Sequence, residues 1–214
     1  MVIKLSNYLT QMSQLVNGSV VDELEDESPA VCYRIAEDVV ARWVKNGKHY
    51  ETLHLSYRHL TELPPLPHNL QRLCCEWNNL TALPPLPDTL IELDCSDNNI
   101  KELPPLPSGL RYLSCMNNPI EHIESLPQSL MSLHCSYFKF TTLPQLPDSL
   151  LVFDCINGPL EVLPRLPYRL HMMFVDHHTL QYPPPNSCLM HNINNIREWM
   201  DAHPYNIIKS AKKC

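Results

Sequence analysis

Residues 93–107 of this chain read LDCSDNNIKELPPLP, and the same pattern recurs every 20 residues through the middle of the sequence. The copies align without insertion on Leu53, Leu73, Leu93, Leu113, Leu133, Phe153 and Met173. A fixed period of about this length is the signature of a solenoid, in which each copy stacks on the next. Six full copies and a partial seventh therefore predict an α/β repeat solenoid over residues 52–186.

Each copy opens with a segment that alternates as a short strand does. In L-x-C, we expect Leu93 and Cys95 to point inward while Asp94 and Ser96 point outward. Successive copies would stack these segments into a parallel sheet.

The rest of each copy returns the chain to the next strand. The Asn at 78, 98 and 118 suits a turn whose short amide bonds the neighbouring coil, which predicts an asparagine ladder. The L-P-x-L-P segment cannot be a helix interior or a central strand, because proline fixes φ and lacks the amide hydrogen. We expect it to run extended along a thin, convex back, with the sheet on the concave side.

Composition narrows the class of protein. The 214 residues carry a formal charge of -7, which argues against nucleic acid because phosphate binding needs a face rich in Lys and Arg. The first seven residues lack the apolar run of a signal peptide, and no window is long and apolar enough to span a membrane. The nine cysteines are an odd number, which argues against a secreted disulfide framework. We therefore expect a reduced protein in the cytoplasm, either of its own cell or of a host cell.

Five cysteines share one register position, at 75, 95, 115, 135 and 155. We interpret them as core packing, because free Cys is a small apolar residue and no CxxC pair suggests a zinc site. Cys74 faces outward beside Cys75 and is a candidate reactive thiol.

Both ends of a solenoid need covering, so we expect residues 1–51 to form a helical N-terminal cap and residues 187–214 a C-terminal cap and tail. Ser28 as N-cap, Pro29 at the first helical position and Gly47 at the end predict one capping helix. Its expected apolar face consists of Val31, Ile35, Val39 and Trp43, flanked by Cys32, Ala36, Val40 and Val44. Weaker patterns predict short helices near residues 6–16 and 192–202.

The consensus LPPLPxxLxxLxCxxNxLxxLPPLP resembles the short leucine-rich repeats of the YopM and IpaH effector families. The resemblance covers about Leu53 to Leu180. In the L-x-C segment, where those effectors usually carry valine or isoleucine, this chain has cysteine, and in this respect it resembles leucine-rich-repeat proteins of large DNA viruses. It implies a curved repeat fold that acts as a scaffold. The ubiquitin-ligase domain of the IpaH kind, with its Cys-x-Asp motif, has no counterpart, since neither Cys188 nor Cys214 stands in such a motif.

The outward residues of the sheet differ between copies while the core residues repeat, as expected of a recognition surface. Large aromatic residues, which often dominate interfaces, stand there beside a cluster of Glu76, Glu92, Asp94 and Asp97 that would favour a protein partner with a basic patch. We expect partner contacts from Tyr57, Arg72, Glu76, Trp77, Glu92, Asp94, Asp97, Tyr112, Asn117, His134 and Tyr137. Alternatively, Tyr57 and Trp77 pack on the N-terminal cap, and the acids are solvated charge.

Nothing in the sequence advertises catalysis or a cofactor. There is no glycine-rich phosphate loop, and no Ser or Cys nucleophile has an identifiable base. The histidines at 134, 171, 177 and 178 with Asp176 could hold a metal, but their spacing matches no ligand motif. We therefore expect a non-enzymatic interaction module without cofactor, such as an effector or viral host-interaction protein. A self-assembling or virion component and a ubiquitin-ligase adaptor remain alternatives.

Overall fold

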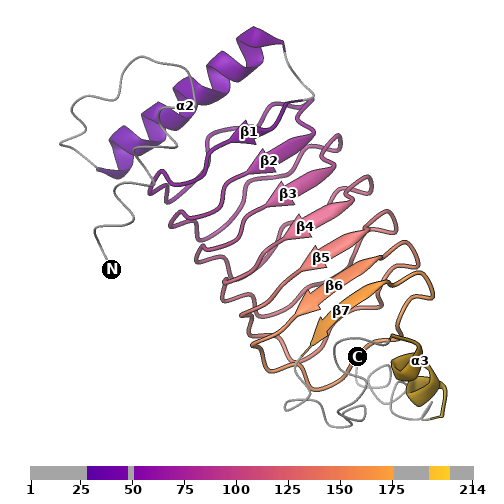
Figure 1. Cartoon of the computed structure of the whole chain (residues 1–214). Coiled ribbons are helices and arrows are strands. Elements are labelled where there is room, and N and C mark those ends of the chain that lie inside the picture. The colour runs from indigo at the N-terminus through magenta and orange to yellow at the C-terminus, as the bar shows by residue number, and fades with distance from the viewer. Residues whose placement is uncertain (1–27, 48–50, 176–192, 203–214) are drawn as a thin grey trace, which may run out of the picture.

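The computed structural model describes residues 28–47, 51–175 and 193–202, which form two helices and seven short parallel strands (Figure 1). The helices are α2 (Pro29–Asn46) and α3 (Ile193–Ala202). The strands are β1 (Leu53–His54), β2 (Arg72–Cys74), β3 (Glu92–Asp94), β4 (Tyr112–Ser114), β5 (Ser132–His134), β6 (Val152–Cys155) and β7 (Met172–Val175). The helix expected near residues 6–16, the residues 176–192 and the tail after residue 202 lie outside the described residues.

The strands form one sheet in chain order, β1-β2-β3-β4-β5-β6-β7. Leu53 pairs with Leu73, Leu73 with Leu93, and the same offset of 20 residues continues to Phe153 and Met173. The predicted period and register are confirmed, and Figure 1 shows the coils stacked along one axis with α2 across the β1 end.

Two buried apolar residues from each strand region form the inner side of the sheet, and in the middle coils they are a leucine and a cysteine. Leu93 and Cys95 are fully buried, as are their counterparts in the neighbouring coils. The thiols also hydrogen-bond along the stack: Sγ of Cys75, Cys95 and Cys135 each donate to a carbonyl of the next coil at 3.4 Å. The packing interpretation of this row is confirmed, and the seven described cysteines are free thiols.

The asparagine ladder is present in three coils. The Asn98 amide donates to the carbonyls of Cys75, Cys95 and Ser96 at 3.0 Å, while its oxygen accepts the Leu80 N–H at 3.0 Å. Asn78 and Asn118 make the corresponding bonds in their own coils. Each buried amide thus joins two coils and satisfies backbone groups that would otherwise be orphaned.

The proline-rich segments on the back contain neither helix nor sheet strand, as predicted. Each ends in a tight turn that repeats through the stack, where for example the Leu90 N–H donates to the Pro87 carbonyl at 3.0 Å. Hydroxyls join these turns, because Oγ of Ser129 donates to the carbonyls of Ser108 and Leu110 at 2.7 and 2.6 Å.

Helix α2 begins and ends as the sequence predicts. Ser28 is the N-cap residue, Pro29 opens the first turn, and Gly47 closes the helix with a left-handed φ of 64°. The buried side of the helix differs from the expected stripe, since Cys32, Ala36 and Trp43 are buried while Val31, Ile35 and Val39 are only half-buried. Ala36 is the most completely buried residue of the helix, so the buried side is centred beside the valine and isoleucine row.

Helix α3 matches the predicted C-terminal helix and is attached to the last described coil by Arg197. Its guanidinium donates to the carbonyls of Tyr168 and, at 3.0 Å, Leu170, and it lies 5.1 Å from the Tyr168 ring centroid. The apolar side chains expected to face the coil lie outside the described part of this helix.

Candidate partner-binding surface

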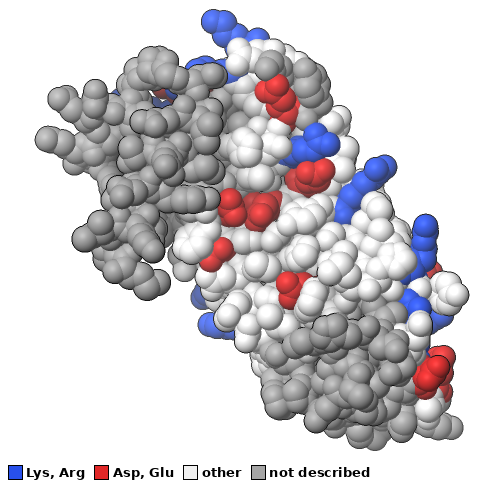
Figure 2. Space-filling view, in the orientation of Figure 1, with Lys and Arg blue, Asp and Glu red and all other residues white. Residues whose placement is uncertain are grey.

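The outer face of the sheet, hereafter the sheet face, carries the residue before each aligned leucine and the residues one, three and four positions after it. Of the eleven residues predicted to contact a partner, all lie on this face and none is buried. The sequence register therefore brings the predicted set together on one surface. Figure 2 shows acidic side chains gathered over the strands, with Lys and Arg mainly along one edge.

One position on the sheet face has an unusual backbone conformation in six successive coils of the described residues. The residue four positions after the aligned leucine has φ between 51° and 61° in six successive coils. We call this set the left-handed column: Tyr57, Trp77, Asp97, Asn117, Tyr137 and Asn157. Asp and Asn tolerate this region comparatively well, but Tyr and Trp rarely adopt it, because Cβ approaches the backbone carbonyl. Sequence reasoning identified the column without its backbone conformation.

The aromatic members of the left-handed column are exposed. Tyr57, Trp77 and Tyr137 are 43%, 51% and 57% accessible. The Tyr57 and Trp77 rings stack with their centroids 5.9 Å apart and an interplanar angle of 10°. Tyr112 is half-buried, and its ring lies 5.5 Å from that of His134. The face thus presents a two-ring stack near one end and a single tyrosine further along.

The acidic residues separate into a paired and an unpaired group. Arg72 Nε lies 3.0 Å from Glu92 Oε1, so these two predicted contact residues form an ion pair with each other. Glu76 lies near Asp94 and Asp97, and burial together with these two carboxylates raises its pKa. Among the described residues, no cation pairs with Glu76, Asp94 or Asp97.

The surroundings of Cys74 disfavour the thiolate form that a reactive thiol needs. Burial, together with Asp94, Glu76 and Glu92, raises its pKa to about 11. Since the thiolate is the reactive form, the structure favours the inert thiol at neutral pH.

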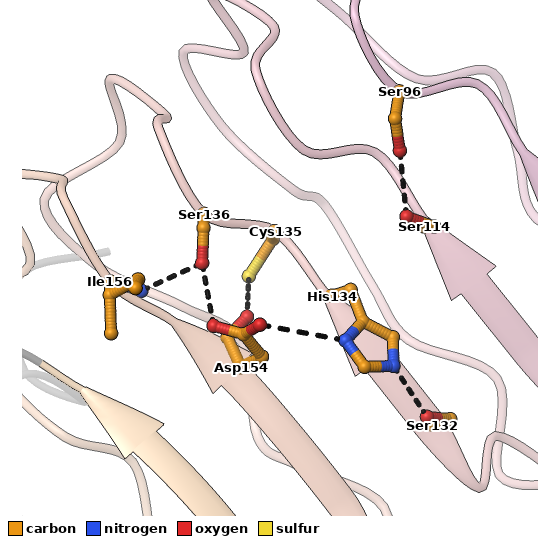
Figure 3. A network of polar contacts seen from close by, with 8 residues as sticks. All are labelled: Ser96, Ser114, Ser132, His134, Cys135, Ser136, Asp154 and Ile156. Carbon is orange, nitrogen blue, oxygen red and sulfur yellow. Dashed lines mark hydrogen bonds and ion pairs between the residues drawn. The ribbon is translucent and has the colours of Figure 1, made fainter. Parts of the chain in front are cut away.

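A polar network surrounds His134 on β5 and β6 (Figure 3). Its Nε2 lies 2.9 Å from Ser132 Oγ, and its Nδ1 lies 3.6 Å from Asp154 Oδ2. Asp154 Oδ1 accepts the Ser136 hydroxyl at 2.6 Å. Of this group, the sequence selected only His134. Asp154 was detectable, because it stands 20 residues after His134 and the register pairs the two positions.

Ser132, His134 and Asp154 have the order of contacts found in a Ser-His-Asp triad, so the structure provides a base that sequence spacing did not reveal. Acyl transfer also requires hydrogen-bond donors that point at a developing oxyanion. The N–H groups of Met131 and Ser132 instead donate to the Arg111 carbonyl at 2.8 and 3.0 Å. The two backbone donors at the candidate nucleophile are thus engaged in the sheet, and the arrangement is better suited to polar recognition than to catalysis.

Three serines at outward register positions of the sheet are buried, which corrects the expectation that outward positions such as that of Ser96 are exposed. Ser96, Ser114 and Ser136 are 4%, 3% and 2% accessible. Their hydroxyls bond to one another or to Asp154; the Ser96 and Ser114 hydroxyl oxygens are 2.7 Å apart. They order the surface from beneath and are not exposed on it.

The described ranges contain neither a cluster of metal ligands nor a helix that could span a membrane. No group of three or more His, Cys, Asp or Glu there could hold a metal ion, and Asp176, His177 and His178 of the candidate metal set fall outside these ranges. Neither described helix is long and apolar enough to cross a membrane.

The repeat geometry, the register and the asparagine ladder together define a leucine-rich-repeat solenoid. A family model described as leucine-rich repeats in two copies matches residues 88–128, and the chain belongs to the leucine-rich-repeat family. Among solved structures, a Shigella effector leucine-rich-repeat domain is 30% identical with a TM-score of 0.60, covering 75% of this chain and 69% of that one.

Two YopM structures are also similar. YopM from Yersinia enterocolitica WA-314 is 27% identical with a TM-score of 0.62, covering 81% of this chain. YopM from Yersinia pestis, titled a leucine-rich effector protein, is 28% identical with a TM-score of 0.58, covering 66% of this chain. The present chain spans 36% and 46% of the length of these two proteins. No curated protein matches the chain.

Proposed function

We propose that this chain is a non-enzymatic interaction module that binds a protein partner on its sheet face and acts as an effector or host-interaction protein. The contacts come from the eleven predicted residues, centred on Trp77, Asp97 and Tyr137. The likeness to effector repeat domains supports this role, because repeat solenoids present extended surfaces for recognition.

The observation that carries the proposal is the presence of large aromatic residues in the left-handed column. Short polar residues are sufficient for the backbone turn at this position, since three coils have Asp97, Asn117 and Asn157 there. Trp77 and Tyr137 adopt the same strained φ, and more than half of each side chain is exposed. Neither the backbone nor the core requires a ring there. Trp and Tyr are the residues most enriched at interface hot spots, so a partner surface accounts for their presence.

The test compares two full-length variants as bait in host-cell lysate. The first carries Trp77→Ala, Glu92→Gln, Asp97→Asn and Tyr137→Asn on the sheet face. The control carries Glu62→Gln, Glu124→Gln and Asp148→Asn, which neutralise exposed acids outside the sheet. Quantitative mass spectrometry should show that the first variant loses partners that the wild type and the control both capture.

Equal capture by the first variant would contradict the proposal. So would light scattering that shows concentration-dependent assembly of the purified chain through surfaces outside the sheet, because the protein would then be a structural component.

A further inference from the structure

The Tyr57–Trp77 stack continues along the left-handed column into a carboxylate. Corresponding positions of neighbouring coils are about 4.8 Å apart, since adjacent strands have that spacing. Tyr57 occupies the position in the coil before Trp77, and Asp97 occupies it in the coil after. One face of the indole is therefore directed toward Tyr57 and the other toward the coil that carries Asp97.

The Asp97 carboxylate is oriented, and it has an oxygen to spare. Its Oδ1 accepts a hydrogen bond from Asn117 Nδ2 at 2.6 Å, which leaves Oδ2 for another donor. Asp97 is only partly exposed, so an ion pair formed here would be screened less than one at an open surface.

Glu76 and Asp94 add negative charge to the same place. The two ion pairs between described residues are Arg72–Glu92 and His134–Asp154, so these carboxylates lack a cationic partner in this part of the chain. Burial, and after it the charges of Asp94 and Asp97, raises the pKa of Glu76. A bound cation would reduce the repulsion among these three carboxylates. An organic cation carried by a protein partner would be complementary to this negative charge.

We infer that the sheet face recognises an arginine side chain of its partner, which stacks on the indole of Trp77 on the side away from Tyr57 and pairs with Asp97. This rests on the proposed function and specifies the chemistry of the partner: a basic protein segment that contains arginine. A guanidinium is planar, stacks on aromatic faces and donates in a fork to a carboxylate. A lysine ammonium is compact, strongly hydrated and unable to stack as a plane. The ring beside a carboxylate therefore selects arginine over lysine.

The experiment measures binding of two labelled probe peptides to the full chain by fluorescence anisotropy at fixed ionic strength. One is an acetylated hexa-arginine amide and the other is the matching hexa-lysine, which has the same charge. We expect the arginine peptide to bind at least about threefold more tightly, the size of a modest cation–π contribution.

Three variants separate stacking from charge. Trp77→Leu should bring the arginine peptide to the affinity of the lysine peptide. Asp97→Asn should weaken the arginine peptide about tenfold, as expected for loss of a charge-assisted hydrogen bond. Glu124→Gln, an exposed acid outside the sheet, should bind both peptides as the wild type does and controls for net charge.

Equal binding of the two peptides by the wild type would overturn the inference, as would an arginine preference that survives Trp77→Leu. The result is distinguishable from failure of the proposed function. If capture of the lysate partners still depends on the sheet face but hexa-arginine does not bind, the proposed interaction surface is supported and the arginine site is contradicted. If capture of the lysate partners does not depend on the sheet face, the proposed function itself is contradicted.

Discussion

At the scale of single residues, the left-handed column shows a conflict between backbone and surface. Asn157 and Tyr137 hold nearly the same φ, 57° and 61°. The Asn suits this conformation, whereas the Tyr adds steric cost and exposes 57% of a large side chain. A residue that is unfavourable for the free protein in both respects is best explained by what it contacts when bound.

Replacing Tyr137 by Asn should therefore stabilise the free protein while weakening partner binding. We expect the free energy of unfolding to rise by about 0.5–1 kcal/mol, because Asn relieves the left-handed strain and little packing is lost. Urea denaturation followed by circular dichroism measures this change. Tyr137→Ala removes the ring without relieving the strain as fully and should be less stable than Tyr137→Asn. Equal stability of all three proteins would contradict the strain argument.

At the scale of elements, the asparagine ladder ends where an aromatic cluster begins. The position held by Asn78, Asn98 and Asn118 is occupied by Phe138 in the next coil, where it stacks on Phe140 with centroids 4.0 Å apart. Gly158 holds the same position one coil later, and a Cβ there would lie 2.4 Å from the Phe138 ring. The change from hydrogen bonding to aromatic packing thus requires a glycine in the following coil.

Gly158→Ala should consequently destabilise the solenoid. We expect a loss of about 1–3 kcal/mol, the usual cost of overpacking a core, measured by urea or thermal unfolding. Gly109→Ala is the matched control, because the nearest atom to its Cβ would be the Asp88 carbonyl oxygen at 4.0 Å. Adding Phe138→Leu to Gly158→Ala should restore part of the loss. If the Gly158→Ala protein is as stable as the Gly109→Ala control, the prediction is wrong, because the Phe138 ring must then move aside at no measurable cost.

At the scale of the whole molecule, the cysteine row couples the stability of the stack to pH. Burial, the largest cause at each site, raises the pKa of Cys75, Cys95, Cys115 and Cys135 above the ordinary value of 9.0. A thiol with a raised pKa in the folded state holds its proton more tightly than the unfolded chain does. Its stabilising contribution is complete below pH 9 and is lost as the pH rises above that value.

Unfolding under reducing conditions should therefore become easier between pH 9 and pH 10.5. Each buried thiol should contribute a slope of about 1.4 kcal/mol per pH unit once the unfolded chain ionises. Urea midpoints across this range measure the total. The double variant Cys95→Val with Cys115→Val should flatten the slope by the share of two thiols, and an unchanged slope would contradict the assignment.

The repeat, the register, the cysteine row and the ends of α2 could all be predicted from the order of the residues alone. These features depend on periodic or local patterns, in which each residue acts through its own coil or its immediate neighbours in sequence. The same register identified the columns of the sheet face and so placed all eleven candidate residues on one surface.

How the side chains of those columns interact depends on the three-dimensional packing of the coils. The Arg72–Glu92 pair, the Tyr57–Trp77 stack and the link from His134 to Asp154 depend on rotamers and distances between coils, which the period does not encode. Burial of Ser96 and Ser114 likewise depends on how the coils pack together, and the raised pKa of the Cys74 thiol reflects first its burial and then the nearby carboxylates. A repeat specifies positions, because its geometry is the same in every coil, while the chemistry between positions arises from side chains that differ from coil to coil.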